Sequence, residues 1–195
     1  AIRQHLREKR FSGGVFLDIR KAYNSVWHEG LLRRLLELGF NRGLVRFIAS
    51  WLENRCYKTK IGNSTSSSRT HKFGLPQGSA LSCILFAIYF SSVTADLETY
   101  AKLYADDLGL LVHGSVNSWD EDLDMLQRDL TRIAAWCRKW RLCVEPSKSA
   151  WITFTRSPAV RKLKGTRKLW FDGISIPETD KVKYLGVRFD SEVTF

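Results

Sequence analysis

Residues 101–112 read AKLYADDLGLLV, and they form the most informative segment of the sequence. Two short apolar runs, 101–105 and 108–112, are separated only by Asp106 and Asp107. Such spacing predicts a tight β-hairpin with both carboxylates at its tip. Neighbouring carboxylates in a partly dry site repel each other unless a cation or a proton compensates. A solvated turn is the alternative, and the apolar flanks and the basic net charge favour a divalent metal site instead.

A second buried strand ends in another carboxylate. Residues 13–19, GGVFLDI, form an apolar run after two glycines, typical of a strand buried on both faces, and Asp18 lies near its end. A fold that sets this strand end beside the hairpin tip would assemble three carboxylates. Such a cluster suits Mg²⁺, which prefers oxygen ligands and shares its coordination with substrate phosphates. Two such ions can clamp the attacking and leaving oxygens of a phosphoryl transfer.

Helices and strands are interleaved along the rest of the chain. Helical spacing predicts helices over 28–38, 43–54 and 81–93. On the second of these, the residues expected to face inward are Leu44, Phe47, Ile48, Trp51 and Leu52. A further helix to residue 140 is opened by a capping box of Ser118 and Glu121. Strands are predicted at 56–61, 150–155 and 182–189, a loop at 62–69 with a return at 70–73, a basic loop at 156–168, and a hairpin over 169–176. Because strands and helices do not alternate strictly along the chain, this order favours an α+β fold.

The composition indicates a folded, basic domain. The chain has 195 residues, 44% of them hydrophobic, and a formal net charge of +11, which favours a polyanionic partner such as nucleic acid. The basic residues gather in clusters: Arg3, Arg7, Lys9 and Arg10; Arg138, Lys139 and Arg141; Arg156, Arg161, Lys162, Lys164, Arg167 and Lys168. Solvated surface is the alternative account of any one of them.

Neither a membrane span nor a signal peptide is indicated, because no run of about eighteen apolar residues exists and the first ten residues have no apolar core. We therefore expect an intracellular protein with no membrane partner. The four cysteines show no CxxC spacing, which predicts reduced and mostly buried thiols.

Five segments, in this order and at these spacings, resemble motifs A to E of reverse transcriptases. They are FLDIRKAYNSVWH (16–28), GLPQGSALS (74–82), LYADDLGLLV (103–112), CVEPSKSAWITF (143–154) and KYLGVRFD (183–190). The likeness is in particular to the non-LTR retrotransposon type, including the Jockey-like elements of arthropods. YADD alone is a weak signal, whereas five motifs in register are a specific one.

The resemblance implies a fold, an activity and a set of partners. It implies a right-hand polymerase palm, an antiparallel sheet backed by helices, with part of the fingers. Residues 1–195 would be a partial reverse transcriptase domain, with upstream fingers and a downstream thumb missing. The implied activity is RNA-directed DNA polymerisation with two Mg²⁺ ions, or Mn²⁺. The implied partners are an RNA template, a DNA primer, deoxynucleoside triphosphates and other domains of the same polyprotein. Target-primed integration would place the protein in the nucleus, with the cytoplasm as the alternative.

Individual roles follow from the same resemblance. Asp18 and Asp106 would be the principal metal ligands, with Asp107 beside them and the backbone carbonyl of Ile19 contributing. Tyr23 falls at the position of the aromatic gate that excludes a ribose 2′-hydroxyl, and core packing is the alternative for it.

The remaining motifs would handle the nucleotide and the primer. Gln77 and Gly78 would contact the nucleotide and the template, and Lys148 would donate a proton to pyrophosphate, an exposed surface lysine being the alternative. The primer-grip turn would consist of Tyr184, Leu185 and Gly186, for which a plain core strand is the competing account.

The chain also departs from the family pattern. It has Asn24 where relatives commonly carry aspartate, and we expect Asn24 to cap the following helix, although it could instead mark a decayed copy. Cys83 stands where proline is usual in the family, and we expect this difference to have little effect.

Two other hypotheses compete with the polymerase. Because the chain begins just before motif A, the first is a catalytically inactive, nucleic-acid-binding remnant, and we expect the isolated 195 residues to be inactive. The second is a viral RNA-dependent RNA polymerase palm, against which Tyr23 argues.

Overall fold

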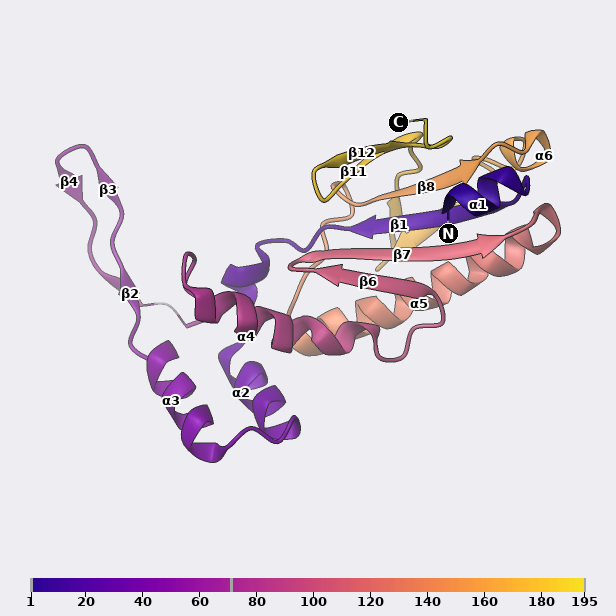
Figure 1. Cartoon of the computed structure of the whole chain (residues 1–195). Helices are drawn as coiled ribbons and strands as arrows, with labels where there is room; N and C mark the ends of the chain where they lie inside the picture. Colours follow the sequence, from indigo (N-terminus) through magenta and orange to yellow (C-terminus); the bar gives the residue numbers. More distant parts are fainter. Residues whose placement is uncertain (1, 71, 195) are drawn as a thin grey trace. The chain divides into compact units, whose positions relative to one another are not determined.

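The chain folds into two compact units of helices and antiparallel strands. The computed structural model describes residues 2–70 and 72–194 (Figure 1). Unit 1 comprises residues 1–20, 93–139 and 143–195, and unit 2 comprises residues 21–92 and 140–142. The α+β class predicted from the sequence is therefore confirmed.

A four-stranded antiparallel sheet forms the centre of unit 1. Its strand order is β6 (Tyr100–Tyr104), β7 (Asp107–Gly114), β1 (Phe11–Leu17) and β8 (Ala150–Thr155). Strand β1 pairs along its whole length with β7, from Phe11 opposite Gly114 to Leu17 opposite Leu108. The predicted buried strand is confirmed, and it begins two residues earlier than expected.

One face of this sheet is covered by α5 (Trp119–Trp140) (Figure 1). A Cβ placed on Gly13 would lie 3.3 Å from the Leu126 side chain, so the glycine lets the helix approach β1 closely. The predicted helix is confirmed, but the predicted capping box is wrong. Ser118 pairs with Ser115 across the short helix η3 (Val116–Ser118), because the chain turns tightly there before α5 begins.

The opposite face is covered by α1 (Ile2–Arg7) and by the hairpin of β11 (Lys181–Tyr184) and β12 (Val187–Asp190). Leu6, Ile152, Phe154, Val182 and Val193 form the buried cluster beneath them. The single strand predicted over 182–189 is thus two strands. Leu185 and Gly186, with φ of 50° and 80°, form the turn between them, and a continuous strand does not accommodate such φ values.

The remaining elements of unit 1 lie after β8. The predicted loop over 156–168 contains α6 (Pro158–Arg161). The hairpin of β9 (Leu169–Phe171) and β10 (Ile174–Ile176) turns at residues 172–173, as predicted.

Unit 2 consists mainly of helices. It contains η1 (Ala22–Ser25), α2 (His28–Glu37), α3 (Arg42–Leu52) and α4 (Ala80–Phe90), and η2 (Ser91–Thr94) follows α4. Four two-residue strands form a ribbon: β2 (Cys56–Tyr57) pairs with β5 (Arg69–Thr70), and β3 (Lys60–Ile61) pairs with β4 (Ser64–Thr65). The strand predicted over 56–61 is thus two short pieces. The return predicted at 70–73 begins with Thr70, and residue 71 lies outside the described residues.

Two sequence expectations about burial are wrong in part. On α3, Ile48 and Leu52 are buried as predicted and Trp51 is half-buried, whereas Leu44 and Phe47 are exposed, because the buried stripe runs through Val45, Ile48 and Leu52. All four cysteines are free as predicted, but only Cys137 is buried, since the other three lie on exposed parts of their segments. Within residues 2–70 and 72–194, no helix has the length and apolar character needed to cross a membrane.

Candidate functional site

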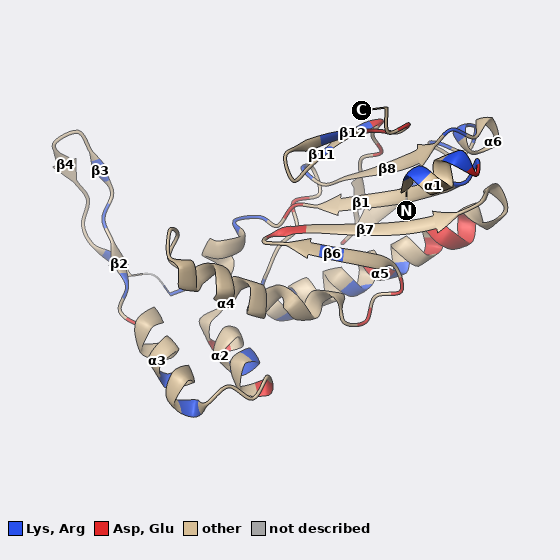
Figure 2. Ribbon diagram, viewed as in Figure 1, with Lys and Arg blue, Asp and Glu red and all other residues tan. Residues whose placement is uncertain are grey.

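Two of the predicted carboxylates lie at neighbouring strand ends in unit 1. The last pair of the β1–β7 ladder is Leu17 with Leu108, so the next residues, Asp18 and Asp107, stand opposite each other. Directly opposed residues of antiparallel strands direct their side chains to the same face. Acidic residues mark the end of β1 and the start of β7 in Figure 2. The structure therefore brings residues 89 positions apart to one edge of the sheet.

The hairpin that carries Asp106 is turned one residue earlier than predicted. Tyr104 pairs with Asp107, so the two turn residues are Ala105 and Asp106, and Asp107 is the first residue of β7. Ala105 has φ of 52°, a conformation that glycine adopts more easily. Backbone strain of this kind is typical of functional sites, where it is retained because the surrounding strands impose it.

The three carboxylates share one electrostatic environment. Burial raises the pKa of Asp107, and the negative charges of Asp106 and Asp18 raise it further. All three side chains remain partly exposed. A bound cation would relieve this repulsion, so the donor set has the charge and the oxygen chemistry that Mg²⁺ prefers.

The carboxylates do not form a complete metal cage. Across the part of the chain that the structure describes, no three His, Cys, Asp or Glu side chains are grouped closely enough to hold an ion by themselves. The sequence predicts that three carboxylates assemble. They share one edge of the sheet, but they do not form a closed group. Mg²⁺ commonly uses one or two carboxylates together with water and substrate phosphates, so this arrangement fits the ion.

The residue after Asp18 is held by a bridge to the chain before β8. Ile19 pairs with Val144, and in this bridge the Glu145 amide donates to the Asp18 carbonyl (2.8 Å) and the Arg20 amide donates to the Cys143 carbonyl (2.8 Å). In this type of antiparallel pair, the carbonyl of the paired residue points away from its partner. The Ile19 carbonyl therefore points toward the β7 side, where the carboxylates lie.

The turn over residues 145–149 is attached directly to Asp18. The Asp18 amide donates to Ser149 Oγ (3.2 Å), and Ser149 Oγ donates to the Glu145 carbonyl (2.9 Å). Lys148 lies exposed on this turn, and its amide donates to the Glu145 carbonyl (3.0 Å). The sequence reasoning missed Ser149, whose burial and contact with Asp18 make it a positioning residue, because only its neighbour Lys148 matched a motif.

Tyr184 lies on the same face of the sheet as the opposed carboxylates. Its ring packs on Phe16 with centroids 4.7 Å apart, and its hydroxyl would be 3.3 Å from a Cβ on Gly109. Burial raises the pKa of Tyr184, and the charge of Asp107 adds to this effect. Leu185 and Gly186 form the adjoining turn. The structure thus brings the predicted primer-grip turn to the carboxylate-bearing face.

The predicted nucleotide-binding residues of unit 2 line one pocket. Its volume is about 270 Å³, and its lining consists of Tyr23, Pro76, Gln77, Gly78, Ser79, Ser82 and Cys83. Tyr23 stacks on Phe86 with centroids 4.8 Å apart yet stays partly exposed, so it serves packing and still faces the pocket. Ser82 Oγ donates to the Pro76 carbonyl (2.6 Å), which fixes the loop above α4.

Asn24 has a different local role from the predicted one. It lies within η1, and α2 begins at His28 after Trp27, so Asn24 does not cap that helix. A Cβ on Gly74 would come within 2.9 Å of the Asn24 backbone, and the Leu75 amide donates to the Tyr23 carbonyl (2.7 Å). The backbone around Asn24 therefore anchors the GLPQG loop.

The fold and the acidic strand ends define the palm class of nucleic-acid polymerases. The structure matches a telomerase from Candida tropicalis with a TM-score of 0.65 at 12% identity, over 100% of this chain and 37% of that one. The chain belongs to the family described as reverse transcriptase (RNA-dependent DNA polymerase), whose profile matches residues 2–189. Family and fold are thus as predicted.

The curated relatives come from mobile elements. The chain is 32% identical to a probable RNA-directed DNA polymerase from transposon BS of Drosophila melanogaster, over 100% of this chain and 22% of that protein. It is also 32% identical to the RNA-directed DNA polymerase from mobile element jockey of Drosophila funebris, over 97% of this chain and 21% of that protein. The chain thus spans about a fifth of the length of these relatives.

Proposed function

We propose that this chain is the catalytic core of an RNA-directed DNA polymerase that works within a non-LTR retrotransposon protein. The observation that carries the proposal is the opposition of Asp18 and Asp107 at adjacent strand ends, with Asp106 in the turn between β6 and β7. Unit 1 would serve as the palm and unit 2 as part of the fingers. The reaction would extend a DNA primer along an RNA template and release pyrophosphate.

The carboxylates and one carbonyl would form the metal site. Asp18, Asp106 and Asp107 would hold two Mg²⁺ ions, or Mn²⁺, together with the Ile19 carbonyl. When bound, these ions lower the pKa of the primer 3′-hydroxyl and neutralise charge on the triphosphate. Ser149 and the 145–149 turn would keep the Asp18 backbone in place. The raised pKa of Asp107 supports this assignment, because carboxylates positioned to bind cations repel one another when no cation is bound.

The other motif residues would handle substrate and product. Tyr23 would lie under the sugar and exclude the 2′-hydroxyl, while Gln77 and Gly78 would contact the base pair through a loop whose glycine permits close approach. Lys148 would give a proton to the departing pyrophosphate. The turn formed by Tyr184, Leu185 and Gly186 would support the primer end.

The partners and location follow as parts of the same proposal. The partners would be an RNA template, a DNA primer, deoxynucleoside triphosphates and further domains of a polyprotein, of which the chain matches only a part in its relatives. Target-primed integration would take place in the nucleus.

The decisive experiment is primer extension by the complete reading frame that contains these residues. We expect Asp106→Asn to lower deoxynucleotide incorporation on a primed RNA template by at least about a hundredfold, the scale of losing one preorganised charge at a reacting phosphate. Template binding should stay within about twofold. The matched control is Asp180→Asn. It removes the same charge from an exposed aspartate that is paired with Lys164.

The inactive-remnant hypothesis is decided by the unsubstituted protein. Incorporation above background excludes it, whereas template binding without any extension supports it. Activity that survives Asp106→Asn would instead contradict the metal assignment.

The sugar gate separates the DNA polymerase from an RNA polymerase. We expect Tyr23→Val to admit ribonucleotides, because a smaller side chain leaves room for the 2′-hydroxyl. The measurement is the ratio of ribonucleotide to deoxynucleotide incorporation, with Tyr23→Phe as the control that keeps the ring. An unchanged ratio in Tyr23→Val would remove Tyr23 from this role.

A further inference from the structure

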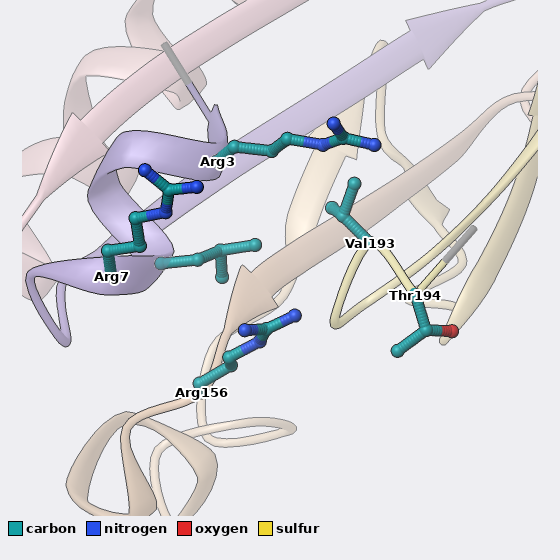
Figure 3. A pocket seen from close by; sticks show the side chains of 6 residues that line it. Arg3, Arg7, Arg156, Val193 and Thr194 are labelled. Atoms are coloured by element: carbon teal, nitrogen blue, oxygen red, sulfur yellow. The ribbon is translucent and has the colours of Figure 1, made fainter.

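A hollow lined by arginines lies in unit 1, where α1, the end of β8 and the segment after β12 meet (Figure 3). Its volume is about 370 Å³. The lining consists of Arg3, Leu6, Arg7, Arg156, Val193 and Thr194. We refer to it as the arginine pocket. None of the residues assigned to polymerisation lines it.

Two arginines of the arginine pocket, Arg7 and Arg156, have no carboxylate partner among the described residues. Arg3 and Arg7 stand one turn apart on α1, a spacing at which like charges destabilise a helix. Arg156 donates to the backbone carbonyl of Glu192 (3.1 Å). An anion placed in the hollow would offset the repulsion between Arg3 and Arg7.

The acidic side chains close to the arginine pocket are already engaged. The Glu192 carboxylate accepts from Arg161 (2.5 Å). Asp190 accepts from the Thr194 hydroxyl (2.5 Å) and from the amides of Glu192 and Thr194 (3.0 and 3.1 Å). The Glu192 carboxylate is thus bound to α6 and the Asp190 carboxylate to its own turn, and neither residue lines the hollow.

The walls of the pocket are held in shape. Leu6 belongs to the buried cluster with Ile152, Phe154 and Val193, which fixes α1 on the sheet. Val193 has φ of 53°, an unusual conformation for a β-branched residue, retained within the turn that Asp190 closes. A site with fixed walls loses little conformational entropy when a ligand binds.

We infer that the arginine pocket binds a phosphodiester group of a nucleic-acid strand, at a point remote from polymerisation. Guanidinium groups match phosphate oxygens in charge and in planar, bidentate geometry. The inference deepens the proposed function and rests on it for the nature of the partner. RNA and DNA present the same phosphate, so the experiment distinguishes between them.

The position of the pocket indicates which phosphate it would take. Strand β1 separates the pocket, beside Phe11, from Asp18, and seven residues of strand span about 23 Å. At a spacing of about 3.4 Å per nucleotide along a strand, this corresponds to about seven nucleotides. The pocket would therefore hold a strand well outside the base pair being formed.

The test is equilibrium binding of the protein encoded by the complete reading frame to labelled 20-nucleotide single strands of RNA and of DNA. Binding is measured by fluorescence anisotropy without Mg²⁺ or nucleotides. We expect Arg7→Gln and Arg156→Gln each to weaken binding by about tenfold, the scale of one charge-assisted contact. Each should reduce the slope of log Kd against log salt by about 0.7. Arg33→Gln, on α2 and paired with Glu37, removes one charge elsewhere and should stay within about twofold.

Two further variants distinguish binding of one phosphate in the pocket from general attraction by positive surface charge. If both arginines hold one phosphate, the double variant Arg7→Gln with Arg156→Gln loses less than the product of the single effects. Arg7→Lys keeps the charge but not the planar fork, so it should bind more weakly than the wild-type chain. Circular dichroism melting checks each fold, and Arg7→Gln carries the test if Arg156→Gln does not fold.

The inference would be overturned if the pocket variants matched Arg33→Gln, if the single effects multiplied independently, or if the wild-type chain bound neither strand. A loss seen with only one strand assigns the pocket to RNA or to DNA. Because this assay needs no chemistry, its failure is distinct from a failure of primer extension.

Discussion

On the face of the central sheet that α1 and the β11–β12 hairpin cover, the two ends carry opposite charge. At one end, Asp18 and Asp107 oppose each other across β1 and β7. At the other end, Arg7 and Arg156 line the arginine pocket beside the first residue of β1. Between them the strands are apolar and buried against α5 on one face and the β11–β12 hairpin on the other. The strands of one sheet thus connect an acidic end and a basic end about 23 Å apart.

The difference between the ends lies in what positions them. The acidic edge is set by backbone register, because the β1–β7 pairing that buries Val15, Leu17, Leu108 and Leu110 also brings Asp18 opposite Asp107. The basic edge is set by side-chain packing, since α1 is held through Leu6 and the last segment through Val193. Perturbing the core should therefore affect the two edges unequally.

The largest effect is expected from Leu126→Ala. Leu126 is fully buried and packs against Gly13 at the centre of the sheet, so its truncation should lower the free energy of unfolding by about 2–5 kcal/mol. Urea denaturation measures the loss. Leu185→Ala, at an exposed turn, should change it by less than about 0.5 kcal/mol. Equal losses in the two variants would show that α5 does not support the sheet as described.

Sequence reasoning predicted the acidic edge far better than the basic one. Asp106 and Asp107 stand between two apolar runs, and Asp18 ends a third, so periodicity and charge identified the strands on which they lie. The one-residue displacement of the turn arose because Ala105, and not an acidic residue, adopts positive φ. Residue propensities do not indicate such a choice, because the strand register imposes it.

The arginine pocket could not be predicted in the same way. Arg7 and Arg156 belong to separate basic clusters, and nothing in their spacing indicates that α1 packs beside the end of β8. The same applies to Ser149, whose contact with Asp18 joins residues 131 positions apart. Local patterns predict elements, whereas long-range packing of α1 and of the last turn decides which side chains meet.

A smaller effect is expected when the repulsion at the acidic edge is removed. Like charges directly opposite on a sheet are destabilising, so Asp107→Asn should raise the free energy of unfolding of the metal-free chain by about 0.2–1 kcal/mol. The measurement is thermal melting with and without Mg²⁺. Magnesium should stabilise the wild-type chain more than Asp107→Asn, and Asp180→Asn should behave like the wild type. Destabilisation by Asp107→Asn without metal would mean that the carboxylate is held by favourable contacts.

The smallest effect is expected at the basic end and depends on pH. His113 lies on β7, its Nδ1 is 2.7 Å from Ser12 Oγ, and its ring stacks on His5 of α1 with centroids 4.2 Å apart. Burial lowers the pKa of His113, and the positive charges of His5 and Arg10 lower it further. Since the unfolded chain then binds a proton more readily than the folded one, the free energy of unfolding should be constant above about pH 6.5 and should fall below it.

The test compares two histidine variants in urea melts between pH 5 and pH 8. His113→Asn, which can keep a hydrogen bond to Ser12, should remove most of this pH dependence, whereas His28→Asn on α2 should retain it. An unchanged slope in His113→Asn would show that the histidine pair does not couple α1 to the sheet through its charge.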